Sequence, residues 1–240
     1  MDNSDDENID AMRCLFEMNL PETIDEKQFT CSNSNVIDIQ IVCSDFIDPG
    51  ALQSVKFIWP ASNALAMYLC QMSITGKKVL ELGAGSGLVG LSIAKQNPNS
   101  HVLFTDRDAF LLEMVCKSAK LSNISNIACS SLNWGESKQA QDDFASLKLE
   151  ERENIDLIVG ADLCYSTDSI HMLFFTVQKL LRASNATYIQ CSSFRVEEST
   201  EIIVGLCRKY EIARKVLKNT IGSEDGVIIE QFNNIQDLHN

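Results

Sequence analysis

The chain has 240 residues, of which 45% are apolar, and it carries a formal net charge of −13. This length and composition suit one α/β domain with a sizeable core. The negative charge argues against binding to the phosphate backbone of nucleic acids as the main activity, because such binding depends on clustered Lys and Arg. The sequence has no run of about 18 apolar residues, so we expect no membrane-spanning helix and no membrane partner.

The cysteines and histidines argue against disulfides and metal sites. Nine cysteines lie scattered through apolar segments, and no two form a C-x-x-C pair, so we expect reduced, mostly buried thiols. The three histidines stand far apart in the sequence, so we expect no bound metal. The first residues lack the basic and apolar regions of a signal peptide. We therefore expect a cytoplasmic location, with the nucleus as a second compartment, and we expect a monomer.

The first 35 residues carry more than half of the net charge, with nine acidic side chains against Arg13 and Lys27. Such a composition is typical of a solvated segment without a packed core. We therefore expect residues 1–34 to have no fixed structure, with a segment that fills the active face as the alternative, and we expect deletion of residues 1–33 to leave the fold and the cofactor affinity unchanged. Residues 35–240 are expected to form a single domain.

This domain begins with an expected β extension over residues 35–58. Alternating apolar residues predict one strand at 36–42, and a second short strand is expected at 55–58. Pro60 then stands at the start of an expected helix that runs to Met72.

A glycine-rich stretch follows at residues 79–90, which read V-L-E-L-G-A-G-S-G-L-V-G. The pattern predicts a strand, a tight turn and a helix. Glycines at the end of a buried strand let a ligand approach the backbone, and the next helix supplies free N–H groups. The stretch is therefore a candidate cradle for a nucleotide cofactor.

Strands and helices continue to alternate after this stretch. We expect strands at 101–105, 124–132, 155–160 and 186–191, helices from 108, at 168–182 and at 196–209, and an exposed loop with a little helix at 136–154. Two strands without a helix between them, at 210–217 and 227–232, predict an antiparallel hairpin. The order indicates an α/β fold with a mostly parallel sheet and one reversed edge strand.

Two cofactor patterns overlap in the glycine stretch. Residues 85–90 fit the dinucleotide fingerprint G-x-G-x-x-G, whereas residues 81–87 fit the E-x-G-x-G-x-G pattern of S-adenosylmethionine enzymes. Asp106 ends the next strand, where a carboxylate binds ribose hydroxyls in both classes. Glu81 favours S-adenosylmethionine, because a diphosphate beside a carboxylate would meet like charge, whereas a sulfonium would not. Gly90 is then expected to serve close packing of the helix on the sheet.

Three further short segments stand beside the glycine stretch: Trp59-Pro60-Ala61, Leu132-Asn133-Trp134-Gly135 and Asp162-Leu163-Cys164-Tyr165. With these four segments, residues 57–232 resemble the family 16 group of seven-β-strand, class I, S-adenosylmethionine-dependent methyltransferases, which largely methylate lysines of proteins. Asp162 to Tyr165 match the D-x-x-Y motif of that family. The resemblance implies a Rossmann-like, seven-stranded, mostly parallel sheet with helices on both faces. The long acidic N-terminal segment departs from what the resemblance leads us to expect.

The resemblance also implies site residues. The cofactor S-adenosyl-L-methionine, which leaves as S-adenosyl-L-homocysteine, would contact Trp59, Glu81, Gly83, Ala84, Gly85, Gly87, Asp106, Arg107, Asn133, Trp134 and Ala161. Asp162 and Tyr165 would face the substrate amine as catalytic residues. Independently of the resemblance, Asp162 directly follows a central strand, at the edge where open α/β sheets bind ligands.

The expected reaction is transfer of a methyl group to a nitrogen of a protein substrate, with a lysine side chain as the first choice. Arginine, histidine and a small-molecule amine stay open as acceptors. Two other classes of protein are alternatives. A NAD-type oxidoreductase is disfavoured by Glu81 and because neither Tyr68 nor Tyr165 has a lysine four residues on, as a short-chain dehydrogenase would need. The other alternative is a non-catalytic cofactor-binding protein that regulates a partner.

Overall fold

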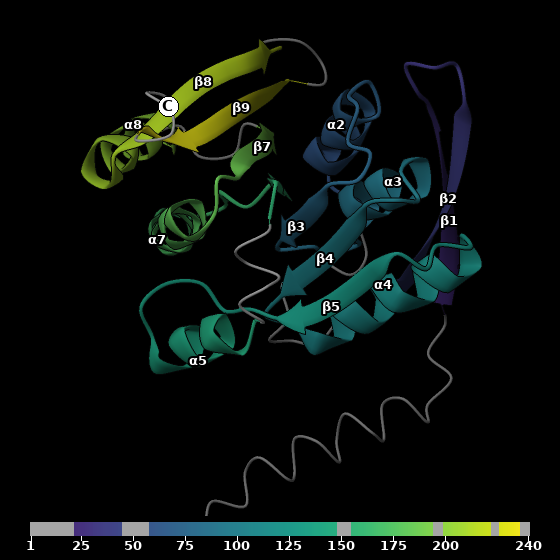
Figure 1. Ribbon diagram of the computed structural model, residues 1–240, viewed down its shortest axis with the longest axis horizontal. Helices are drawn as coiled ribbons and strands as arrows, with labels where there is room; N and C mark the ends of the chain where they lie inside the picture. The colour runs from purple at the N-terminus through teal and green to yellow at the C-terminus, as the bar shows by residue number, and fades with distance from the viewer. Residues whose placement is uncertain (1–21, 45–57, 148–154, 194–198, 222–225, 236–240) are drawn as a thin grey trace, which may run out of the picture.

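The computed structural model describes residues 22–44, 58–147, 155–193, 199–221 and 226–235. Its main feature is a seven-stranded sheet with the order β5-β4-β3-β6-β7-β9-β8 (Figure 1). The strands are β3 (Lys78–Leu82), β4 (His101–Asp106), β5 (Ile127–Ser131), β6 (Leu157–Ala161), β7 (Thr187–Ser193), β8 (Ile212–Asn219) and β9 (Val227–Asn234). Strands β3 to β7 pair in parallel, and β9 is antiparallel to both of its neighbours. The predicted fold class, with its C-terminal hairpin, is confirmed.

The sequence predicted that the reversed strand would lie at the edge of the sheet. Instead, the reversed strand β9 lies between β7 and β8. Burial explains the difference. Strand β9 carries Ile229 and Phe232, which are both fully buried, whereas β8 carries the exposed side chains of Lys215 and Lys218. Basic side chains suit an edge strand, because they oppose pairing with another chain.

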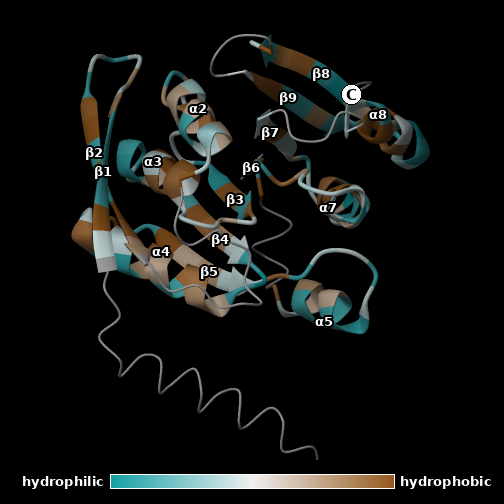
Figure 2. Ribbon diagram, turned by 180° about the vertical axis from the view of Figure 1, so that it is seen from behind, coloured by the Kyte–Doolittle hydropathy of each residue, from teal (hydrophilic) through white to brown (hydrophobic). Residues whose placement is uncertain are grey.

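Helices cover both faces of the sheet. They are α2 (Pro60–Leu69), α3 (Leu88–Gln96), α4 (Ala109–Leu121), α5 (Lys138–Ser146), α7 (Thr167–Ala183) and α8 (Ser199–Tyr210). Residues alternate along β3, so that Val79 packs with α2, α3 and α4, whereas Leu80 and Leu82 pack with α7 and α8 on the opposite face. In Figure 2, apolar colouring follows the central strands and the adjoining sides of these helices. Among the described residues, no helix has the length and apolarity to cross a membrane.

A separate antiparallel hairpin, β1 (Glu22–Thr30) and β2 (Val36–Ser44), packs outside α3 and α4 (Figure 1). Every second residue of β2 points inward, and Ile39 and Ile41 are fully buried. The outer edge of β2 is held by α4, because the backbone N–H groups of Gln40 and Val42 donate to the hydroxyls of Ser122 and Ser118, both over 2.9 Å.

This hairpin differs from the expected β extension in two ways. The partner of β2 is β1, a strand that was not predicted; residues 55–57 of the strand expected at 55–58 lie outside the described part of the chain. In addition, β1 falls within the segment 1–34, for which no fixed structure was expected. Phe29 in β1 and Cys31 directly after it are buried. The strand could not be recognised from the sequence because it has many acidic side chains and few inward-facing residues.

Element boundaries differ from the predicted ones by a few residues. Helix α2 ends at Leu69 instead of Met72, and the polar segment 136–154 contains the nine-residue helix α5. The remaining predicted strands and helices are present with shifted ends.

Candidate functional site

A cavity of about 400 Å³ opens at the carboxyl ends of β3, β4, β5 and β6. Strand order reverses between β3 and β6, so the cavity lies at the switch point where open α/β sheets bind ligands. Its volume falls in the range of small-molecule and cofactor pockets. It is lined by Trp59, Ser62, Gly83, Ala84, Gly85, Ser86, Asp106, Arg107, Asp108, Leu111, Leu132, Asn133, Trp134, Ala161, Asp162, Leu163, Tyr165 and Met172.

The turn after β3 forms one wall of the cavity. Gly83 has a φ of +56°, and a Cβ atom there would lie 2.6 Å from the Leu163 side chain and 3.0 Å from the Trp134 ring. Only glycine combines this backbone conformation with so close an approach. The next glycine, Gly85, donates its N–H to Oδ2 of Asp106 over 3.0 Å. The turn and the end of β4 are thereby joined.

Asp106 is a nearly buried carboxylate. Its Oδ1 accepts the N–H of Asp108 over 3.1 Å, so both oxygens carry a backbone hydrogen bond. Burial raises the pKa of Asp106 above its ordinary value, against the opposing effect of these N–H groups. Each oxygen has capacity for a second hydrogen bond, so the carboxylate can still accept ligand hydroxyls.

Two predicted cofactor residues, Glu81 and Gly87, do not line the cavity. The Oε2 atom of Glu81 accepts the N–H of Gly90 in the first turn of α3 over 2.9 Å. Burial raises the pKa of Glu81 to about 8. Gly87 is the N-cap of α3, and a Cβ atom there would lie 2.7 Å from the Val115 side chain. Both residues therefore support the glycine turn and the start of α3 and do not line the cavity.

The buried position of Glu81 also corrects the electrostatic argument on the cofactor. With a pKa of about 8, this carboxyl group is mainly protonated at neutral pH. A neutral acid does not repel a diphosphate, so the charge of Glu81 no longer separates the two cofactor classes.

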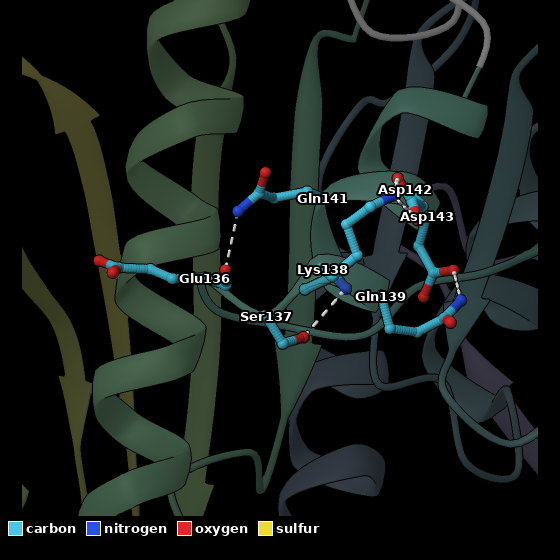
Figure 3. Close-up of polar contacts among 8 residues, drawn as sticks. Glu136, Ser137, Lys138, Gln139, Gln141, Asp142 and Asp143 are labelled. Carbon is cyan, nitrogen blue, oxygen red and sulfur yellow. Dashed lines mark hydrogen bonds and ion pairs between the residues drawn. The ribbon is translucent and has the colours of Figure 1, made fainter.

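Asn133 and Trp134 form the opposite wall, after β5. The backbone N–H and the side-chain amide of Asn133 both donate to Oδ2 of Asp143 over 2.8 Å. Asp143 lies on α5, where its Oδ1 accepts the amide of Gln139 over 2.7 Å (Figure 3). Burial alone would raise the pKa of Asp143, but the donors from Asn133 and Gln139 hold it below its ordinary value. Helix α5 therefore fixes the wall that carries Asn133.

Trp134 supplies a polar atom that needs a partner. Its Nε1–H group is buried and has no hydrogen-bond partner among the described residues. A buried donor left unpaired costs about 1–3 kcal/mol, and a bound polar ligand would remove that cost. The open glycine turn, the Asp106 carboxylate and this donor fit a cofactor that carries a ribose and a heterocyclic base.

Two segments that lie far apart in the sequence meet at the cavity, namely the start of α2 and the residues after β6. Pro60 occupies the first position of α2, where its missing N–H costs nothing, so Ala61 offers the first free N–H of the helix. This N–H donates to Oδ2 of Asp162 over 3.3 Å. The Oδ1 atom of Asp162 accepts both the N–H and the hydroxyl of Ser193, over 2.8 and 2.7 Å. Tyr165, 41% exposed, stands at the rim.

Most of the predicted site residues therefore meet at one cavity, and Glu81 and Gly87 lie behind its glycine wall. The lining residues that sequence reasoning missed are Ser62, Ser86, Asp108, Leu111, Leu132, Leu163 and Met172. It also missed Ser193, which ends β7 next to the end of β6. That position at the carboxyl edge was the available signal. Among the described residues, no group of His, Cys, Asp or Glu could hold a metal ion.

The sheet order, the glycine turn at the switch point and the carboxylate at the end of the next strand define a cofactor-binding protein of the seven-strand methyltransferase class. Solved structures support the fold. A methyltransferase from Pyrococcus furiosus is 18% identical, with a TM-score of 0.54, over 80% of this chain and 90% of that one. TYW2 from M. jannaschii, solved in complex with AdoMet, is 14% identical, with a TM-score of 0.52, over 89% and 87% of the two chains.

Sequence comparison identifies the family. A family model described as lysine methyltransferase matches residues 48–206. The protein N-lysine methyltransferase METTL21A of Danio rerio is 29% identical over 160 residues, which are 65% of this chain and 68% of that protein. The histone-arginine methyltransferase METTL23 of Mus musculus is 28% identical over 165 residues, 67% of this chain and 61% of that protein. The matches thus span about two thirds of these relatives. The chain belongs to the lysine methyltransferase family, which confirms the predicted family and class of enzyme and implies use of S-adenosylmethionine.

Proposed function

We propose that this protein transfers a methyl group from S-adenosylmethionine, bound in the cavity, to the side-chain amine of a lysine in a protein substrate. The observation that carries the proposal is the meeting of two sets of groups at one cavity. The glycine turn, Asp106 and Trp134 line it together with Asp162 and the partly exposed Tyr165. Family membership supports the reaction class.

The cavity residues suit different parts of the cofactor. Asp106 would accept the ribose hydroxyls, Trp134 would contact the adenine, and the backbone of Gly83 and Gly85 would lie against the amino-acid part. The cofactor supplies the chemistry, a methyl group on a positively charged sulfur. The protein holds the acceptor nitrogen in line with it and keeps water out of the reaction path.

The acceptor amine must reach the cavity and lose its proton, since a lysine has an ordinary pKa of about 10.4. Asp162 can hold the incoming ammonium by a charge-assisted hydrogen bond. Tyr165 can orient the nitrogen through its ring face or its hydroxyl. No histidine lines the cavity in the described part of the chain, so the proton passes to water and positioning dominates the mechanism.

Arginine is the second candidate acceptor, because METTL23 of Mus musculus is named a histone-arginine methyltransferase. The two acceptors give different products. Acid hydrolysis of labelled protein yields either methyllysine or methylarginine, and chromatography separates them.

Two measurements test the proposal. Thermal unfolding of the purified protein with S-adenosylhomocysteine, and separately with NAD, tests the cofactor, and we expect stabilisation by S-adenosylhomocysteine alone. Incubation with tritiated S-adenosylmethionine and cell lysate tests the activity, and we expect a labelled protein band that yields methyllysine. Stabilisation by NAD alone, or the absence of labelled protein, would contradict the proposal.

A further inference from the structure

The Asp162 carboxylate accepts three hydrogen bonds, of which two go to Oδ1 and one goes to Oδ2. Ser193 donates both its N–H and its hydroxyl to Oδ1. A carboxylate oxygen has two lone pairs, so Oδ1 is fully used. Among the described residues, Oδ2 accepts the N–H of Ala61 alone, over the longer distance of 3.3 Å. Oδ2 therefore keeps capacity for a second hydrogen bond, and Asp162 lines the cavity.

We propose that Ser193 is a positioning residue for methyl transfer, which occupies Oδ1 of Asp162 so that Oδ2 alone receives the substrate nitrogen. The inference rests on the proposed function and deepens it. An ammonium carries its donors on one nitrogen and needs a single acceptor point. A guanidinium binds a carboxylate best through two parallel hydrogen bonds to both oxygens. With Oδ1 occupied, the site favours the amine of lysine over the guanidinium of arginine.

The backbone of Asp162 also has an uncommon conformation and a hydrogen bond to β7. Asp162 has a φ of +55°, in the left-handed region that few residues other than glycine adopt. Its N–H donates to the carbonyl of Cys191 in β7 over 2.9 Å. Strand β7 thus bonds both to the backbone and to the side chain of Asp162. Cys191 accepts the N–H of Asp162, and Ser193 donates to its carboxylate. Loss of the Ser193 hydroxyl frees one lone pair of Oδ1 and leaves the carboxylate held by the N–H groups of Ser193 and Ala61.

The matched control is Ser184, another serine whose hydroxyl makes a buried hydrogen bond, to the carbonyl of Leu180 over 2.8 Å. It follows the end of α7, near the start of β7, whereas the cavity lies at the strands' carboxyl ends. Ser184→Ala therefore loses a comparable hydrogen bond away from the site. Ser193→Thr keeps the hydroxyl and tests rescue.

The experiment measures the initial rate of tritiated methyllysine formation in cell lysate at saturating S-adenosylmethionine, for the wild type, S193A, S193T and S184A. We expect S193A to be about tenfold slower, because a 1 Å misplacement costs about 100-fold and two of the three donors to Asp162 remain in S193A. S193T should recover most of the rate, and S184A should match the wild type. The stabilisation of S193A by S-adenosylhomocysteine should equal that of the wild type.

Failure of the inference on Ser193 can be distinguished from failure of the proposed function. If S193A forms methyllysine at the wild-type rate, the role of Ser193 is wrong and the proposed function stands. If S193A loses stabilisation by S-adenosylhomocysteine, or if S193T fails to recover the rate, Ser193 acts on the fold and the inference is overturned. If the wild type forms methylarginine and no methyllysine, the inference and the proposed acceptor both fall.

Discussion

At the scale of single residues, Gly90 shows how closely α3 packs on the sheet. A Cβ atom there would overlap Oε2 of Glu81 and lie 2.5 Å from the ring of Phe104. Because neither group can move freely in the core, we expect Gly90→Ala to lower the free energy of unfolding by about 1–3 kcal/mol. Urea denaturation measures the change.

The control for this substitution is Gly205 in α8, where a Cβ atom would meet nothing within 4 Å. Gly205→Ala should stabilise the protein by about 0.5–1 kcal/mol, because alanine loses less conformational entropy in a helix. Equal effects of the two substitutions would show that Gly90 does not serve packing.

The Glu81 carboxyl group gives a pH dependence to stability. Its pKa rises from 4.5 to about 8 on folding, chiefly by burial, so between these values the folded state binds more protons than the unfolded state. Stability should therefore fall as pH rises through this range. Glu81→Gln keeps an acceptor for the N–H of Gly90 but does not titrate.

We expect the free energy of unfolding to fall less between pH 6 and pH 8.5 in Glu81→Gln than in the wild type, as measured by urea denaturation. Glu201→Gln, which removes a charge from the exposed side of α8, is the matched control. Parallel decline in the wild type and in Glu81→Gln would contradict the assigned pKa.

The sequence predicted these residues unequally well. The role of Gly90 followed from its spacing, because a glycine in a first helical turn next to a buried strand signals close approach. Glu81 was placed among the cofactor residues because the family pattern includes it. A one-dimensional pattern does not tell on which face of β3 a side chain lies relative to the cavity, and the alternation along β3 points Glu81 toward α3.

At the scale of elements, the outer hairpin is attached to α4 by two serine hydroxyls. Ser118 and Ser122 lie one helical turn apart and accept the N–H groups of Val42 and Gln40. Ser118→Ala leaves the buried N–H of Val42 unpaired, which should cost about 1–3 kcal/mol. We expect faster amide hydrogen exchange at Val42, with little change in β3 to β7.

The control is Ser131→Ala, which removes an exposed hydroxyl at the end of β5. It should leave exchange at Val42 unchanged. Protection of Val42 in Ser118→Ala at the wild-type level would show that the hydroxyl does not anchor the hairpin.

The C-terminal hairpin is fastened by a buried ion pair. Glu230 on β9 is 2% exposed and accepts the guanidinium of Arg214 on β8 and the side-chain amide of Gln190 on β7. Arg214→Ala leaves a buried carboxylate without its cation, so we expect a loss of about 3–5 kcal/mol in stability.

An exposed ion pair serves as the comparison. Arg182 and Glu211 are 3.9 Å apart, with side chains 53% and 66% exposed. Arg182→Ala should change stability by about 1 kcal/mol or less. Calorimetric unfolding of both variants measures the contrast, and similar losses would contradict the difference in burial.

Elements were predictable where their pattern was local. Proline and glycine marked the start of α2 and the turn before α3, and apolar runs marked the buried strands. Two features depended on distant parts of the chain. The pairing of β1 with β2 rests on few inward-facing residues, and the insertion of β9 beside β7 depends on which hairpin strand is the more buried.

At the scale of the whole molecule, two deletions in the acidic N-terminal segment should have different effects on the melting temperature. Deletion of residues 1–33 removes β1 with its buried Phe29, removes the buried Cys31 directly after it, and leaves β2 without its strand partner. Burial of a phenylalanine is worth about 1.5–3 kcal/mol, so the melting temperature should fall by several degrees. This reverses the sequence-based expectation.

Deletion of residues 1–21 is the control, because it leaves β1 intact. We expect it to keep the melting temperature of the full chain and the stabilisation by S-adenosylhomocysteine. An unchanged melting temperature after deletion of residues 1–33 would show that β1 adds nothing to stability. The monomeric state, the cytoplasmic location and the binding roles of individual cavity residues stay predictions.

The place of β9 bears on the order in which the protein is made. Ribosomes release β7 and β8 before β9, yet β9 must enter between them. Until then the edge of β7, with Ile189 and Cys191, lacks its neighbour on that side. Since Ser193 pairs with Val227, the end of β7 that carries Ser193 gains its second neighbouring strand only once β9 has been made. A chain without β9 would expose this apolar strand edge, which favours aggregation.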